Sequence, residues 1–294
     1  MKKGNLVFYF VLFVFTNLNA QNVRLNLFAG TANYNGDLQS KQITFQQAKF
    51  SVGSWVSYDI SSKIMLRGGL HYAQVQAADR YQSNPQNVLR NLSFATNIWE
   101  LHAGGEYHFL GMDERVFSPY VFAGVAGLHF NPFAKDAAGN KIFLKPLSTE
   151  GQGLAAYPDR KPYSLTQFAI PFGIGVRMVL TDKVDVGVEF GYRKTFTDYM
   201  DDVSTSYINP AAFVNPASFT MSYRTPELAG HTTDPYPVEF EKRGGEKYKD
   251  NYYFIGITFS YKLTGKDRFS GFQKEGGQEI VNQTSVARQM CSDY

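Results

Sequence analysis

Residues 184–192 read Val-Asp-Val-Gly-Val-Glu-Phe-Gly-Tyr, and their strict alternation decides the fold. Every second residue is apolar, and the residues between them are glycine or acidic. A period of two is the pattern of a β-strand, because successive side chains point to opposite faces. The segment therefore predicts a strand with one apolar face and one small or charged face.

Other segments of the chain repeat this pattern, and we expect further strands over 23–27, 48–58, 64–72, 97–109, 120–130, 170–180 and 251–261. Only 120–130 is apolar on both faces, so the alternation does not orient it. Aromatic residues stand near the strand ends, where membrane barrels carry interfacial girdles. They are Tyr58, Tyr72, Phe109, Tyr120, Tyr192 and Tyr261.

Connections between these strands are alternately long and short. The short ones are 59–63, 110–119 and 181–183, whereas 131–169 and 195–250 are long and rich in proline. Outer-membrane barrels combine short periplasmic turns with long extracellular loops, and such long loops are uncommon in compact soluble domains. Residues 21–263 therefore predict an all-β, eight-stranded antiparallel transmembrane β-barrel with long extracellular loops and short periplasmic turns, rather than a soluble β-sandwich. The long loops either cover the barrel mouth or dock a partner.

Two segments flank the predicted barrel. Residues 1–20 combine Lys2 and Lys3 with an apolar run and end at Ala20, which is the pattern of a cleaved signal peptide. Residues 264–294 are polar with balanced charges, so we expect a flexible tail in the periplasm, either partner-binding or inert. The chain has one cysteine, Cys291, and hence no intramolecular disulfide.

Composition narrows the function. The chain has 29 Lys and Arg against 26 Asp and Glu, a net charge of +3, and 16% of its residues are aromatic. Nucleic-acid binding needs a concentrated basic face, which this balance does not supply. We expect the chain to contact outer-membrane lipid and not to bind nucleic acid.

Charged residues occupy the polar faces of the predicted strands. An eight-stranded barrel has an interior just wide enough to be filled by side chains. The inward set is Arg24, Arg67, Arg177, Arg193, Glu100, Glu106, Asp185 and Glu189, with His71, His102 and His108 among them. Four basic and four acidic groups can neutralise one another, so we expect a salt-bridged plug and not an open pore.

Several segments carry a family resemblance. The most specific is Gly191–Ser204, which contains Thr-Asp-Tyr-Met-Asp-Asp-Val-Ser; the others are 34–38, 91–94, 117–124, 129–132 and 147–153. With these segments the chain resembles a Bacteroidota outer-membrane barrel family, mostly of unknown function, that includes the PorG-type barrel of the type IX secretion system. The resemblance implies an outer-membrane location. It also implies a role in tying a periplasmic ring of the translocon to that membrane, with ring proteins or lipoproteins as partners.

Acidic residues gather at the outer strand ends. The candidates at the loop bases are Asp37, Glu150, Asp198, Asp201 and Asp202, with Arg193 beside them. Clustered carboxylates can hold Ca²⁺. The spacing is not that of an EF-hand, so we favour hydrogen bonds that cap turns and ion pairs with Arg193 and Lys194. We expect no metal and no cofactor.

Three functions remain open. His129 with Ser118 or Ser164 could serve a lipid-modifying hydrolase, but the chain has no Gly-x-Ser-x-Gly elbow. A surface ligand-binding barrel or narrow channel is a second alternative. We favour a non-enzymatic barrel that anchors or organises an envelope assembly through its short turns and tail.

Overall fold

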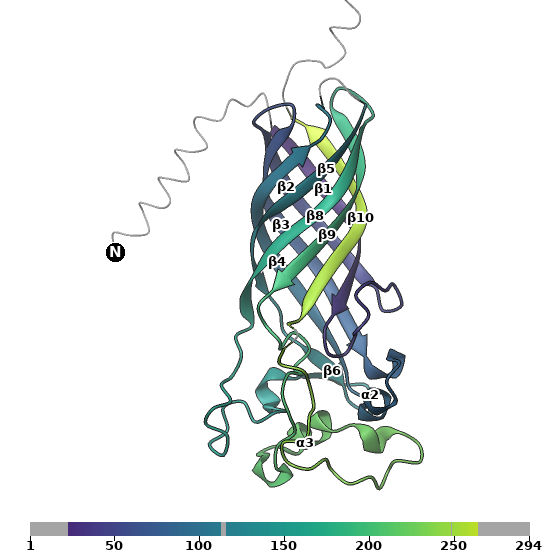
Figure 1. Cartoon of the computed structure of the whole chain (residues 1–294), viewed down its shortest axis with the longest axis vertical. Helices are drawn as coiled ribbons and strands as arrows, with labels where there is room; N and C mark the ends of the chain where they lie inside the picture. Colours follow the sequence, from purple (N-terminus) through teal and green to yellow (C-terminus); the bar gives the residue numbers. More distant parts are fainter. Residues whose placement is uncertain (1–22, 113–115, 248, 264–294) are drawn as a thin grey trace, which may run out of the picture.

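The computed structural model describes residues 23–112, 116–247 and 249–263, and in them eight long strands form a closed barrel (Figure 1). The strands are β1 (Val23–Asn35), β2 (Lys49–Asp59), β3 (Ile64–Ala78), β4 (Ser93–His108), β5 (Phe117–His129), β8 (Thr166–Val179), β9 (Val184–Thr195) and β10 (Asn251–Lys262). Each pairs antiparallel with its neighbours, and β1 pairs with β10 to close the sheet. The predicted eight-stranded antiparallel barrel is confirmed. The predicted signal peptide and tail lie outside the described residues.

The seam between β1 and β10 shows why the first strand was predicted too short. Gly30 lies opposite Gly256, and a Cβ on Gly30 would stand 2.2 Å from the carbonyl oxygen of Ile255. The two backbones therefore approach too closely for a side chain. Small residues at this seam hide the alternation after residue 27, whereas β1 continues to Asn35.

The outer wall of the barrel is apolar. Large hydrophobic side chains are exposed around it, including Leu25, Leu27, Val56, Leu66, Leu70, Leu101, Val125, Phe172, Ile174, Val188, Ile257 and Phe259. A closed sheet pairs its backbone groups internally, which is what a strand in lipid requires. The barrel therefore presents a hydrocarbon-compatible belt to its surroundings.

The sequence alternation did not show which face of the strand at 120–130 points inward, but the structure does. Tyr120, Phe122 and Leu128 are buried inside the barrel, whereas Val121 and Val125 are exposed on the wall. The prediction that Tyr120 belongs to an aromatic girdle is therefore wrong, because its position in the alternation turns it inward.

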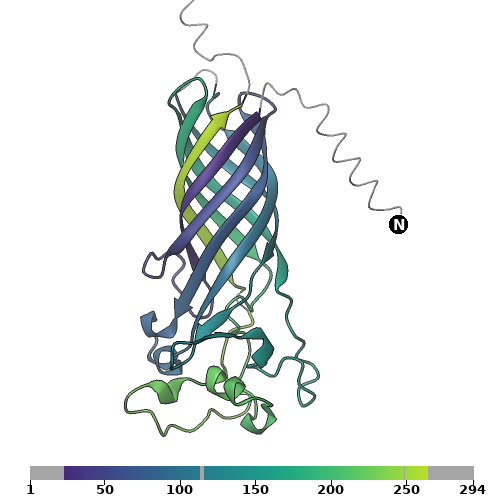
Figure 2. The ribbon, with the colours of Figure 1, turned by 180° about the vertical axis from the view of Figure 1, so that it is seen from behind.

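The long loops fold into an ordered cap at the end opposite the short turns (Figures 1 and 2). We define the cap as residues 36–48, 79–92, 130–165 and 196–250, without residue 248. It contains the short hairpin β6 (Phe133–Lys135) and β7 (Lys141–Phe143), the helices α2 (Pro85–Arg90) and α3 (Pro216–Ser222), and the 3-10 turns η2 (Asp79–Tyr81), η3 (Lys145–Leu147), η4 (Pro210–Ala212) and η5 (Thr225–Glu227). No helix among the described residues is long and apolar enough to cross a membrane.

One apolar cluster joins the outer half of the barrel interior to the cap. Phe94 and Leu128 from the barrel end pack in the same cluster as Leu147, Met200 and Met221 from the loops. The interior is thus polar toward the short turns and apolar toward the cap. This change explains why β3 and β4 extend beyond the predicted ends: their outer inward residues no longer follow the polar-inside pattern.

Candidate functional site

Ion pairs fill the barrel interior, beginning near the short turns. Arg24 on β1 reaches two carboxylates, with its Nη1 2.6 Å from Oδ2 of Asp185 and its Nη2 2.7 Å from Oδ2 of Asp59. Asp59 was not among the predicted inward residues. It is the last residue of β2, where the alternation that would reveal its direction stops.

A second group of pairs lies further along the axis. Arg67 places Nη1 3.2 Å from Oε1 of Glu106 and 2.8 Å from Oε2 of Glu189, while Arg177 places Nη2 3.1 Å from Oε2 of Glu106. The Tyr120 hydroxyl donates to Glu189 at 2.8 Å. The Arg67 guanidinium also lies over the Trp55 ring, 4.1 Å from its centroid.

The outermost pair joins β9 to β4. Arg193 holds Glu100, with Nε 3.1 Å from Oε2, and the Tyr252 hydroxyl donates to the same carboxylate at 2.7 Å. The prediction that Arg193 pairs with the loop carboxylates is wrong, because its inward position on β9 delivers it to Glu100 instead. Lys194, its neighbour, is exposed.

Histidines complete this packing. His71 stacks on Phe254 with ring centroids 4.0 Å apart, and its Nε2 lies 2.7 Å from the Ser51 hydroxyl. His102 and His108 are also buried inside the barrel. The cavity beside Arg67 and Arg193 has only about 10 Å³, room for at most one water molecule. The interior is therefore filled by paired side chains.

The loop-base carboxylates come together at the outer end. The Tyr34 hydroxyl lies 2.6 Å from Oδ2 of Asp201 and 2.5 Å from Oδ1 of Asp250. A phenol has one hydrogen, so it can donate to only one of them at a time. Burial raises the pKa of both carboxyls, and the charge of Asp250 adds to the shift of Asp201. The pair is thus suited to sharing a proton with Tyr34.

A second group of hydrogen bonds in the cap is centred on the guanidinium of Arg243. Arg243 donates from Nη1 to Oε1 of Glu150 at 2.9 Å and to the carbonyl oxygen of Asp202 at 2.8 Å. Glu150 also accepts from the backbone N–H groups of Ser204 and Thr205, at 3.0 and 2.9 Å. These bonds fix the third loop (130–165) and the fourth loop (196–250) to one another.

Asp202 is held from the third loop. Tyr163 donates to its Oδ1 at 2.7 Å and Thr149 donates to its Oδ2 at 2.5 Å. Burial raises its pKa to about 6, against the opposing charge of Arg243. Its φ of +66° is in the left-handed region, so this carboxylate sits on a turn that aspartate tolerates better than most residues.

Asp198 and Asp37 complete the cluster. Asp198 accepts from the Ser204 hydroxyl at 2.7 Å through Oδ2, while its buried Oδ1 has no hydrogen-bond partner. Burial raises the pKa of Asp198 to about 7, and nearby Asp37 and Glu150 add to the shift. Asp37 accepts from the Gly245 N–H at 2.8 Å, and burial raises its pKa as well.

These contacts describe a network of hydrogen bonds with few cations. The structure brings Asp37, Glu150, Asp198, Asp201 and Asp202 together, and adds residues that the sequence did not single out: Tyr34, Tyr163, Arg243 and Asp250. Within the described parts of the chain, no group of three His, Cys, Asp or Glu side chains is arranged to hold a metal ion. The donors present are N–H groups, hydroxyls and one guanidinium.

The predicted histidine–serine combinations are not assembled. Ser118 and His129 lie at opposite ends of β5 and on opposite faces. Ser164 donates to the Thr166 carbonyl oxygen at 2.9 Å, while His129 contacts the Thr166 hydroxyl at 3.1 Å.

A different serine–histidine–carboxylate line exists inside the barrel. His108 lies 3.3 Å from the Ser118 hydroxyl and 3.3 Å from Oε2 of Glu106. Ser118 is fully buried and donates to the Leu110 carbonyl oxygen at 2.6 Å. A nucleophile must be reachable by substrate and bonded to its base. These three side chains therefore contribute to the packing of the interior.

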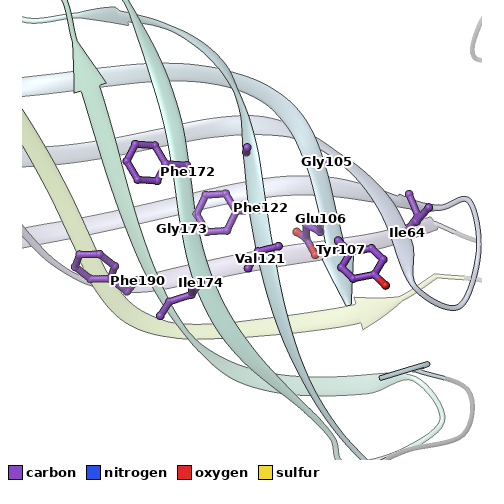
Figure 3. A pocket seen from close by; sticks show the side chains of 11 residues that line it. Ile64, Gly105, Glu106, Tyr107, Val121, Phe122, Phe172, Gly173, Ile174 and Phe190 are labelled. Atoms are coloured by element: carbon purple, nitrogen blue, oxygen red, sulfur yellow. The ribbon is translucent and has the colours of Figure 1, made fainter. Parts of the chain in front are cut away.

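An apolar groove of about 790 Å³ runs along the outer wall, and Figure 3 shows its lining. Outward side chains such as Tyr107, Phe172 and Phe190 border a floor at Gly105 and Ala123. Glu106 also lines it, but that carboxylate is already paired inside the barrel with Arg67 and Arg177. The groove is therefore part of the apolar outer wall.

Comparison with known proteins adds a family model described as a domain of unknown function (DUF6089), which matches residues 3–141. No curated protein matches the chain. Neisserial surface protein A is 13% identical with a TM-score of 0.40, over 82% of this chain and 97% of that one. The outer membrane protein OprG from Pseudomonas aeruginosa is 11% identical with a TM-score of 0.36, over 82% and 97%. A major outer membrane protein from Thermus thermophilus is 12% identical with a TM-score of 0.38, over 81% and 98%.

The location follows from the barrel itself. Closure satisfies the backbone without water, the wall is apolar around its circumference, and short turns alternate with long loops. These are the features of outer-membrane barrels, in which the short turns face the periplasm. The chain is a small outer-membrane β-barrel protein.

Proposed function

We propose that this barrel is a non-enzymatic scaffold that anchors or organises an envelope assembly, as a PorG-like component of type IX secretion. One observation carries the proposal: paired charges fill the interior, and the cap is packed onto its outer end. A filled and capped barrel offers no passage. Its usable surfaces are the two ends that it holds on opposite sides of the membrane.

The periplasmic end carries exposed apolar side chains. Ile60, Leu110, Val116 and Leu180 in or beside the short turns are each between 41% and 56% exposed. Exposed apolar groups clustered on one rim are typical of interaction sites. The resemblance to the PorG-type family favours periplasmic ring proteins or lipoproteins as the partners.

The turns that present this surface are held in place by local hydrogen bonds. The Ser61 hydroxyl accepts from the N–H of Ile64 at 3.1 Å, and the Thr181 hydroxyl accepts from the N–H of Val184 at 3.0 Å. A preformed surface loses little conformational freedom on binding. This favours docking at the turns.

A tagged pull-down from gently solubilised native outer membrane tests the proposal. Periplasmic ring proteins or lipoproteins should be recovered with the unmodified chain and lost when Ile60→Asp and Leu180→Asp are combined. Ile43→Asp changes a similarly exposed isoleucine on the other side of the membrane and should keep the partners. Recovery of the barrel alone, at good yield, would contradict the proposal.

A further inference from the structure

The cap contains a cavity of about 780 Å³ between α2 and the later part of the fourth loop. Both of these segments lie at the extracellular end, away from the short turns (Figure 1). Pockets of about 300–1,000 Å³ are the size that small ligands occupy. Neither the ion pairs of the interior nor the proposed periplasmic docking surface uses this cavity.

One wall of the cavity is aromatic. Tyr207, Tyr223 and Tyr236 line it, with the Tyr236 ring centroid 5.7 Å from that of Tyr207 and 5.3 Å from that of Tyr223. Phe219 stacks on Tyr236 at 5.2 Å and supports it from the side. The hydroxyls of Tyr207 and Tyr223 form no hydrogen bond within the described residues, although both rings are buried. The wall thus combines apolar ring surface with unused hydroxyls.

Side-chain amides line the part of the cavity that α2 supplies. Asn84, Gln86 and Asn87 come from the start of α2. Asn84 uses its Oδ1 to cap the helix and Asn87 uses its Nδ2 to donate to Gln82, which leaves the other half of each amide available. Gln86 is exposed, and its side chain forms no hydrogen bond within the described part of the chain. Each amide can both donate and accept.

Charged side chains of both signs line the cavity in equal number: Asp37, Asp234 and Glu241 against Arg90, Lys242 and Arg243. Arg90 is paired with Asp79 at 2.7 Å and Arg243 with Glu150 at 2.9 Å, so neither guanidinium is a free anion site. Asp234 is 2.7 Å from His231, and Glu241 accepts from the Val238 N–H at 3.2 Å. Because the acidic and basic groups balance, the cavity favours a polar ligand without net charge.

The two parts of the cavity lining are bonded to one another, so the cavity is preformed. Thr225 donates to the Leu89 carbonyl oxygen at 2.8 Å, Asn91 donates to that of Arg224 at 3.1 Å, and Arg90 donates to that of Arg243. A site held open by its own scaffold binds with little ordering cost.

From these observations we infer that the cavity is a binding site for a neutral glycan. The C–H face of a pyranose ring packs on the electron-rich face of an aromatic side chain, and its hydroxyls both donate to and accept from amides. A cavity lined by tyrosines of the fourth loop and by amides at the start of α2, with balanced charges, matches both requirements. The site takes a sugar chain from the extracellular side, independently of the proposed periplasmic assembly role.

Calorimetric titration of the whole purified barrel, in a detergent without a sugar headgroup, tests this site. The probes are maltohexaose, isomaltohexaose, cellohexaose, xylohexaose, mannohexaose and chitohexaose. At least one should bind saturably. Tyr236→Ala and Gln86→Ala should each weaken that binding at least tenfold, whereas Tyr81→Ala, a loop tyrosine outside the cavity, should leave it unchanged.

Gln86→Ala keeps the experiment decisive, because an exposed side chain without hydrogen bonds can be removed without unfolding the cap. Absence of saturable binding by all six hexasaccharides would overturn the assignment. Binding that survives either Tyr236→Ala or Gln86→Ala at its original affinity would overturn it as well.

Discussion

The barrel interior and the base of the cap both bury many carboxylates, but they neutralise them by different means. In the interior, Glu100, Glu106 and Glu189 each lie within 3.2 Å of a guanidinium nitrogen. In the cap, Asp198, Asp201 and Asp250 have hydroxyl and N–H donors instead, and their pKa values are raised. The interior is thus a fixed-charge structure, whereas the cap holds charges that protons can remove.

The origin of the difference is the backbone. Strands place an arginine and a glutamate at fixed positions on facing walls, so every inward charge can meet another across the narrow interior. Loops supply turns with free N–H groups, which aspartates accept from. We therefore expect the barrel interior and the cap to lose their structure independently, and under different conditions.

The largest effect should come from breaking the interior network at its most connected residue. Glu106→Gln leaves Arg67 and Arg177 with less compensation, and removal of one partner of a buried pair costs about 3–5 kcal/mol. The free energy of unfolding, from urea titration of the reconstituted barrel, should fall by that amount. Glu241→Gln, at an exposed cap position, should change it by less than about 0.5 kcal/mol. Equal effects of the two substitutions would refute the view that the interior ion pairs stabilise the barrel.

A smaller and local effect should follow from Arg243→Met. The variant removes the guanidinium that joins Glu150 to the Asp202 carbonyl, and hydrogen bonds to charged groups contribute about 1.5–3 kcal/mol each. Hydrogen exchange should accelerate in 196–247, with the barrel strands unchanged. Lys242→Met, the exposed neighbour, is the matched control. Faster exchange throughout β4 and β9 would mean that the cap and interior are one cooperative unit.

The sequence could predict which residues face inward, but not which of them meet. Alternation is a local property, so Arg67 and Glu189 were assigned to the interior from their own strands. Their contact joins β3 to β9 across the barrel and depends on its closure and register. Asp59 pairs with Arg24 for the same reason, and no local pattern reveals it.

The cap was less predictable than the barrel. Acidic residues at the loop bases were visible in the sequence, and their gathering at one end followed from the topology. The sequence did not reveal their partners. Arg193 was assigned to them by proximity in sequence, whereas Arg243, 50 residues further along, supplies the cation. Long loops have no repeating geometry, so the sequence does not show that the chain brings Arg243 back to these carboxylates.

A change of pH should alter the stability of the cap and leave that of the barrel unchanged. Asp198 has a pKa of about 7 in the folded chain, above the value of about 3.9 for an unfolded aspartate. Over this interval the unfolded form binds fewer protons than the folded one, so stability falls as the pH rises from about 4 to about 7. Protease cleavage in 196–250 should therefore be faster near pH 8 than near pH 5.

Asp198→Asn provides the control, because the amide keeps the size of the side chain and does not titrate. The variant should show a weaker pH dependence of cleavage, while Asp37, Glu150 and Lys249, the charged groups that influence Asp198, remain unchanged. An identical pH dependence in both proteins would assign the effect to other groups, such as Asp201 and Asp250.

The smallest effect is expected at the surface of the cap. Asp234 and His231 lie 2.7 Å apart and are both more than a third exposed, so water and salt screen the pair. Asp234→Asn should change cap stability by less than about 0.5 kcal/mol. Hydrogen exchange of 225–240 measures it, and a change as large as that of Arg243→Met would show that burial is not what separates strong from weak charges here.

The most direct test of the account concerns the filled interior. The purified barrel, inserted into planar lipid bilayers under an applied voltage, should give no stepwise conductance above the lipid background. Reproducible discrete conductance steps, growing in number with the amount of inserted protein, would contradict it. They would mean that the ion pairs of the interior leave an aqueous path open, and that the barrel is a channel.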